Sequence, residues 1–251
     1  MIGPSSFAPT SAALRAVYLF NSLVGLTATS LSLTYVMQVY SALHRRNTLA
    51  LTVHLAANQT GDAAELLVGL GSQGNFDRGY SQLSEIAAEL AAAKEYHHFY
   101  PLLFYFRFDE AFYSVSRVTL VLLDAVTLIK SALDDEQYQW LKASSALVQL
   151  WGGAIALQKT LSTTFVPSHV PGPGAIDAAT REIWRRRYRQ AVARLQQAGI
   201  RTRADERTGA AAYELLRSEW DGYIRVMAPE LGYGNEDIDH ATATARAAQP
   251  R

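Results

Sequence analysis

The residues that could do chemistry in this chain are few, and their spacing matches no familiar site. The best metal-binding candidates are His97 and His98, which are adjacent and flanked by Tyr96 and Tyr100. Neighbouring residues on a helix point about 100° apart, so the two rings are poorly placed to share one ion. The chain contains no His-Glu-x-x-His motif, no histidine pair four residues apart and no cysteine. The sequence therefore predicts no metal site, no disulfide and no thiol chemistry.

Carboxylates, glycines and serines also lack the arrangement that catalysis or cofactor binding needs. The acidic cluster at 134–136 is explained as a helix N-terminus, where the helix dipole favours negative charge. Residues 69–74 read GLGSQG and match a dinucleotide-binding pattern, but the preceding DAAELLVGL is helical rather than a strand. No serine lies in a G-x-S-x-G motif. We expect no catalytic residue, no bound cofactor and no enzyme; a soluble all-α enzyme without a recognisable motif is the alternative.

The overall charge excludes one class of partner. Lys plus Arg number 23 and Asp plus Glu number 23, while 49% of the 251 residues are hydrophobic. A nucleic-acid-binding chain concentrates positive charge to neutralise phosphates, and this one has no excess. The composition suits a packed protein with a sizeable core rather than a disordered chain or a nucleic-acid-binding protein.

The strongest feature is a run of 28 residues without Asp, Glu, Lys, Arg or His, from Ala16 to Leu43. A helix needs roughly 20 mostly apolar residues to cross a bilayer core, and soluble helices usually keep a charged face. Arg15 precedes the run, and His44, Arg45 and Arg46 follow it. We expect one transmembrane helix with the C-terminal domain in the cytoplasm, by the positive-inside rule. A buried helix of a soluble protein is the alternative.

Polar residues inside this run are of types that lipid tolerates. Ser and Thr can return their hydroxyls to a backbone carbonyl one turn earlier. Four small residues recur at spacings of three and four and form what we call the small face: Ser22, Gly25, Thr29 and Ser32. Small faces let membrane helices approach closely. We expect these residues to make helix contacts or to line a pore, with a homo-oligomer or partner channel subunits.

The remaining chain shows helical periodicity with few strand signals, which predicts an all-α fold. We expect residues 1–58 to hold the membrane helix and its extension, 59–165 a helical cytoplasmic domain and 166–176 a Pro/Gly linker. A C-terminal helical pair over 177–231 should pack on that domain, followed by a polar tail over 232–251. Within this scheme, Ser116 is a candidate N-cap, Asp134 with Gln137 a candidate capping box, and 205–231 a single helix.

The helix that follows the linker is rich in arginine. A basic cluster of four side chains is a candidate for contact with anionic lipid at the cytoplasmic face: Arg181, Arg185, Arg186 and Arg189. Pairing with acidic groups of the same domain and a plain solvated face are the alternatives.

Residues 7–46, FAPTSAALRAVYLFNSLVGLTATSLSLTYVMQVYSALHRR, resemble the pore-lining inner helix of bacterial two-transmembrane potassium-channel-like proteins. The elements that carry the resemblance are Pro9, Thr10, Arg15, Gly25, Thr34, Tyr35, Val39, Tyr40 and Ser41. Downstream, YPLLFYFRF, the helix with LLDAVTLIKSAL and the basic helix with its Ala-Gly end are similar to the cytoplasmic helical domain of that family.

The resemblance implies ion transport, but the chain departs from the family at the decisive element. A potassium channel needs a filter of backbone carbonyls between membrane helices, and no T-V-G-Y-G sequence or outer helix is present. The Gly232-Tyr233-Gly234 triplet reads as a glycine stop after the last helix instead. We expect a truncated or degenerate relative, with K⁺ as a transported ion only if a filter lies upstream of Met1. The alternative is a single-span membrane-tethered scaffold or regulatory protein.

Overall fold

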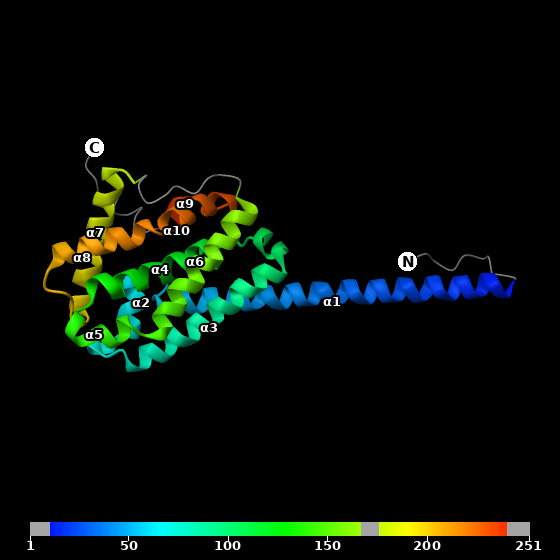
Figure 1. Cartoon of the computed structure of the whole chain (residues 1–251), viewed down its shortest axis with the longest axis horizontal. Coiled ribbons are helices and arrows are strands. Elements are labelled where there is room, and N and C mark those ends of the chain that lie inside the picture. Colours follow the sequence, from blue (N-terminus) through cyan, green and yellow to red (C-terminus); the bar gives the residue numbers. More distant parts are fainter. Residues whose placement is uncertain (1–10, 167–175, 240–251) are drawn as a thin grey trace. The chain divides into compact units, whose positions relative to one another are not determined.

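The computed structural model describes residues 11–166 and 176–239 and is drawn in Figure 1. Helices dominate these ranges, and the only β-type pairing among the described residues is an isolated antiparallel bridge between Leu133 and Thr202. The predicted all-α class, with one long apolar N-terminal helix followed by a helical domain, is confirmed. The chain divides into one unit that ends at Leu43 and a second that begins at His44.

The α-helices are α1 (Ala12–Ala56), α2 (Ala63–Leu70), α3 (Asp77–Phe99), α4 (Val115–Ala132), α5 (Asp135–Lys142), α6 (Ser145–Phe165), α7 (Ala178–Gln197), α8 (Glu206–Ser218), α9 (Asp221–Glu230) and α10 (Asn235–Ile238). Three short 3-10 helices lie between them: η1 (Ser72–Gly74), η2 (Pro101–Tyr105) and η3 (Ala111–Tyr113).

Helix α1 runs for 45 residues without interruption, which corresponds to about 67 Å. Its residues from Ala12 to Gln38 are all exposed. Its last three turns belong to the second unit, where Leu49, Ala50 and Val53 are buried in the core. Residues 44–58, predicted as the cytoplasmic extension of the membrane helix, thus lie within the second unit and contribute apolar side chains to its core.

The second unit is organised around α4. Every residue of this helix except Lys130 is buried. Helices α2, α6, α7, α8 and α9 contact it, and α3 packs on α6 (Figure 1). A helix that is apolar all round suits a central position, because neighbours then cover all of its faces. The neighbouring helices therefore cover the apolar residues of α4, and no membrane is needed to do so.

Helices α2, α5 and α7 each begin with an aspartate cap, and the cap at Asp134 was predicted. Side chains of Asp62, Asp134 and Asp177 accept hydrogen bonds from first-turn backbone N–H groups at 2.7–2.9 Å. The reciprocal half of the predicted capping box is not formed, because the Asp134 N–H donates to the carbonyl of Arg201. The predicted cap at Ser116 was wrong: α4 is preceded by Ser114, and Ser116 is buried within its first turn.

The predicted single helix over 205–231 is two helices, α8 and α9, which break at Trp220. Its ring is fully buried, and its Nε1–H donates to the hydroxyl of Thr127 on α4 at 3.2 Å. Anchoring this large side chain in the core redirects the backbone, which periodicity alone does not show. After α9, Gly232 takes a left-handed conformation (φ +77°), so the predicted glycine stop is confirmed. Most of the predicted linker (167–175) and the tail beyond 239 lie outside the described residues.

Candidate functional site

The first candidate site is the exposed surface of α1. Between Leu14 and Tyr40, fourteen large apolar or aromatic side chains are 45–70% exposed. The most apolar 18-residue window has a mean hydropathy of 1.4, and none of it is buried. By length and composition this helix can cross a membrane, and it is the one helix in the described ranges that meets both criteria.

Four hydroxyl side chains along α1 form hydrogen bonds within the helix itself. Four hydroxyls donate to the carbonyl four residues earlier, each at 2.9 Å: Thr27 to Leu23, Thr29 to Gly25, Ser32 to Ala28 and Thr34 to Ser30. This confirms the expected return of hydroxyls to the backbone. A hydroxyl bonded in this way needs no water, so these residues add little to the cost of placing α1 in hydrocarbon.

The small face of α1 is exposed at all four of its positions. A Cβ atom added at Gly25 would meet nothing within 4 Å. Ser22 and Ser32 flank this position along the same stripe. The surface is therefore free to approach another helix, and its role in helix contacts or pore lining stays a prediction.

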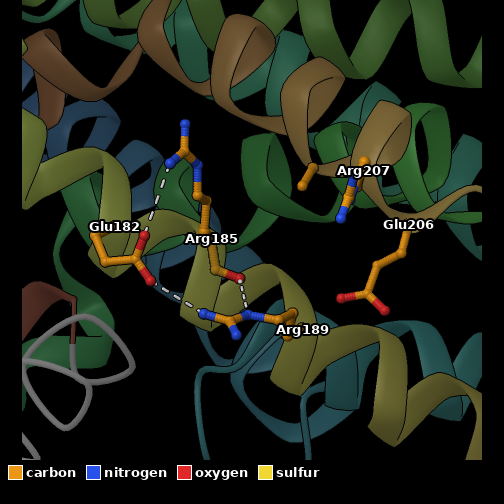
Figure 2. A pocket seen from close by; sticks show the side chains of 6 residues that line it. Glu182, Arg185, Arg189, Glu206 and Arg207 are labelled. Carbon is orange, nitrogen blue, oxygen red and sulfur yellow. Dashed lines mark hydrogen bonds and ion pairs between the residues drawn. The ribbon is translucent and has the colours of Figure 1, made fainter.

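The second candidate is the basic cluster on α7, which borders a surface hollow between α7 and α8. Figure 2 shows Glu182, Arg185 and Arg189 on one side of the hollow and Glu206 and Arg207 on the other. The Arg189 guanidinium donates to Glu182 at 3.1 Å. Acidic and basic groups alternate here, so the hollow is not a uniformly positive surface.

Two of the four arginines predicted to meet lipid are paired within the domain. Arg185 Nε donates to the Glu214 carboxylate of α8 at 2.5 Å, and this bond, together with the charge on Glu214, raises the pKa of Arg185. Arg189 pairs with Glu182 as described above. Arg185 and Arg189 therefore form the arrangement given above as an alternative, in which the arginines pair with acidic groups of the same domain. Contact of Arg181 and Arg186 with lipid stays a prediction.

The third candidate is a buried ionic network centred on Asp124 of α4, whose side chain is fully buried. Arg187 of α7 donates to Oδ2 through Nε, at 2.9 Å, and through Nη2. On Oδ1, the Tyr213 hydroxyl donates at 2.6 Å and Arg217 Nη1 at 3.3 Å. Burial is the largest single influence on Arg187 and acts to lower its pKa, but the charges around it, with Asp124 the strongest, together outweigh burial and the pKa lies above the ordinary value.

Arg217 extends the network to the C-terminal helices. Its Nε donates to Asp221 at 3.2 Å, and its Nη2 pairs with Asp239. The guanidinium also lies 5.4 Å from the ring centre of Trp184 and 5.0 Å from that of Trp220. Such stacking on aromatic faces is a characteristic use of arginine in dry surroundings.

The geometry assigns this network a structural role. A carboxylate has about four lone-pair sites, and Asp124 accepts four hydrogen bonds from protein groups, as counted above. No lone pair is left to accept a proton from a substrate or to hold a metal. The network ties α4 to α7 and α8 and does not carry acid–base chemistry.

Sequence reasoning missed this network, although one signal was present. Asp124 interrupts the apolar run VLLDAVTL, and a charge at such a position needs a buried partner. The arginine-rich 181–194 stretch was the obvious source. Arg187, rather than another arginine of this stretch, pairs with Asp124 because it lies on the face of α7 that packs against the domain. Which face that is depends on tertiary packing.

The other predicted candidates do not come together. His97 is 3% exposed and neither ring nitrogen has a hydrogen-bond partner among the described residues, while His98 is exposed. Across 11–166 and 176–239, no three of the His, Asp and Glu side chains gather as ligands for an ion. The glycine pattern at 69–74 forms the end of α2 and the short η1, not a strand–helix turn.

Comparison of the chain with protein-family models, with curated proteins and with solved structures found no match.

Proposed function

We propose that this chain is a single-span membrane protein in which α1 crosses the bilayer and tethers a helical scaffold domain to one membrane surface. The observation that carries the proposal is the exposed apolar length of α1. The uncharged stretch from Ala16 to Leu43 corresponds to about 42 Å of helix, against a hydrocarbon core of about 30 Å. The excess length accommodates tilt or reaches into both headgroup layers.

Energetics support a membrane rather than water around this helix. Eleven of the exposed side chains between Leu14 and Met37 are Leu, Val, Phe or Met. Fully burying one is worth about 1.5–3 kcal/mol, and each is about half exposed, so transferring the set to hydrocarbon gains on the order of 10 kcal/mol. A whole domain is stable by only about 5–15 kcal/mol. A bilayer supplies a gain of that size without any protein partner.

The rest of the proposal concerns orientation and partners. Basic residues follow the span at 44–46, which favours a cytoplasmic helical domain in the cell membrane. The small face is the surface that we assign to association with a second copy or with partner subunits.

No described residue supports ion conduction: Tyr233 of the glycine triplet is buried and exchanges hydrogen bonds with the backbone of Phe108. Kinship with potassium-channel-like proteins stays a prediction.

Cysteine labelling tests the proposal directly, because the chain has no cysteine of its own. The Leu26 side chain is 70% exposed, so Leu26→Cys should react at once with a maleimide if α1 lies in water. We expect it to resist labelling in native membranes until detergent is added. Gln139→Cys, on the exposed surface of α5, is the matched control and should react in inverted vesicles but not in intact cells. Rapid labelling of Leu26→Cys in membranes, or recovery of the chain in the soluble fraction, would refute the span.

A further inference from the structure

The end of α3 and the residues that follow it form an apolar surface on the helical domain. We call residues 96–108, YHHFYPLLFYFRF, the aromatic segment. It holds seven Tyr and Phe residues and no Asp or Glu. Four of its side chains project into solvent: Phe99 is 67% exposed, Leu102 46%, Tyr105 70% and Phe106 40%. Elsewhere in the helical domain, the exposed large apolar side chains are Leu51 and Leu55 on the last part of α1 and single residues on α5, α6 and α8.

The outward and inward faces of the segment are distinct. Leu103 and Phe104 are buried, and the Phe104 ring stacks on Phe165 with ring centres 4.2 Å apart. The backbone of η2 therefore presents one set of side chains to the core and another outward. The exposed set is held in place by the buried set and is not a loose loop.

Two arginines of α1 hold the segment beside the start of the domain. Arg46 Nη1 donates to the carbonyl of Leu103 at 2.8 Å, and Nη2 donates to that of Phe106 at 3.2 Å. Arg45 donates to the Tyr96 hydroxyl at 2.5 Å. Arg46 is 6% exposed, so it is part of the domain rather than a free cation.

These contacts tie the segment to residues that come directly after the proposed span in sequence. Arg46 follows Leu43, the last residue of the uncharged run, by three residues. The chain that leaves a bilayer core enters a headgroup layer that is roughly 5–8 Å thick on each side. The segment is therefore bonded to the part of the chain that emerges from the hydrocarbon if residues 16–43 occupy it.

We propose that the aromatic segment inserts Phe99, Leu102, Tyr105 and Phe106 into the boundary between headgroups and acyl chains, and so seats the helical domain on the membrane. Aromatic rings prefer this depth because one end is apolar and the other tolerates water. The absence of acidic residues from 96 to 108 suits a surface that carries anionic lipid. This inference rests on the proposed span of α1, and its occupant is lipid rather than protein.

Depth measurement with nitroxide labels on three single-cysteine variants tests the inference. The full chain is reconstituted in vesicles of equal parts phosphatidylcholine and phosphatidylglycerol, and collisions with O₂ and with a water-soluble nickel chelate are compared. Tyr105→Cys reports the segment and Leu26→Cys the span. Val148→Cys, at 63% exposure on α6, is the matched control for an exposed apolar position on the domain.

We expect the Leu26 label deep in hydrocarbon, the Tyr105 label shielded from the nickel chelate severalfold more than the Val148 label, and the Val148 label in water. A deep Leu26 label with the Tyr105 and Val148 labels equally accessible to nickel overturns the seating and leaves the span standing. A water-exposed Leu26 label overturns the span, and the seating fails with it.

Discussion

Removing the charge of Asp124 should cost more stability than any other conservative change in the helical domain. Asp124→Asn keeps the shape of the side chain, but it replaces a carboxylate oxygen with an amide that donates. The amide cannot accept from both Arg187 and Arg217, so at least one buried guanidinium loses its counter-charge. Breaking a buried ion pair by removing one partner costs about 3–5 kcal/mol. For a domain of this size that lowers the midpoint of thermal unfolding by roughly 6–20 °C.

The assay is thermal unfolding of the full chain in detergent micelles, followed by intrinsic fluorescence. Trp184 and Trp220 flank Arg217 and report on the network itself. Glu182→Gln is the matched control, because it removes a carboxylate that pairs with Arg189 at the exposed surface. An exposed ion pair contributes about 0–1 kcal/mol.

Equal small losses in Asp124→Asn and Glu182→Gln would refute the assignment of Asp124 as the central acceptor. A double substitution provides a second check. Replacing Asp124 with Leu and Arg187 with Met removes both charges together, so the combined loss should be smaller than the sum of the two single losses. Additive losses would mean that the two side chains do not depend on each other.

Three further predictions concern other parts of the chain. Burial lowers the pKa of His97 to about 3, and the charge of Arg46 acts in the same direction. Below pH 6.5 the unfolded chain therefore binds a proton that the folded chain does not. The free energy of unfolding should fall by about 1.4 kcal/mol per pH unit as the pH drops toward 3. His97→Leu should remove that part of the slope in unfolding measured between pH 7 and pH 4, and an unchanged slope would contradict the burial of a neutral ring. Gly209→Ala should destabilise the domain by about 1–3 kcal/mol, because its Cβ would lie 2.0 Å from the Tyr188 hydroxyl. Gly152→Ala, with open space around it in α6, should stabilise the domain by about 0.5–1 kcal/mol. Equal effects of the two substitutions on the unfolding midpoint would argue against the packing of α8. Gly25→Leu should weaken subunit association in detergent, measured by light scattering, while Thr27→Leu, about 200° round α1, should not; unchanged association in Gly25→Leu would remove the small face as the contact surface.

Much of the helical framework is predictable from sequence, because the local signals that mark a helix act over a few residues. Asp62, Asp134 and Asp177 cap their helices through bonds to the next turn, and Gly199 and Gly232 end helices through a left-handed backbone. The break at Trp220 was not predictable in the same way, because it depends on a side chain docked on α4.

The exposed helix α1 follows from consecutive residues, whereas the buried network around Asp124 depends on tertiary packing. The uncharged run from Ala16 to Leu43 determines a helix long enough for a bilayer, since length and hydropathy are properties of consecutive residues. Whether such a helix is covered is a question of tertiary structure, and here α1 is exposed whereas the equally apolar α4 is enclosed by its neighbours. The partners of Asp124 and the seat of the aromatic segment on Arg46 likewise join residues far apart in sequence. Electrostatic and packing energies depend on distance in space, and the amino-acid order alone does not give that distance.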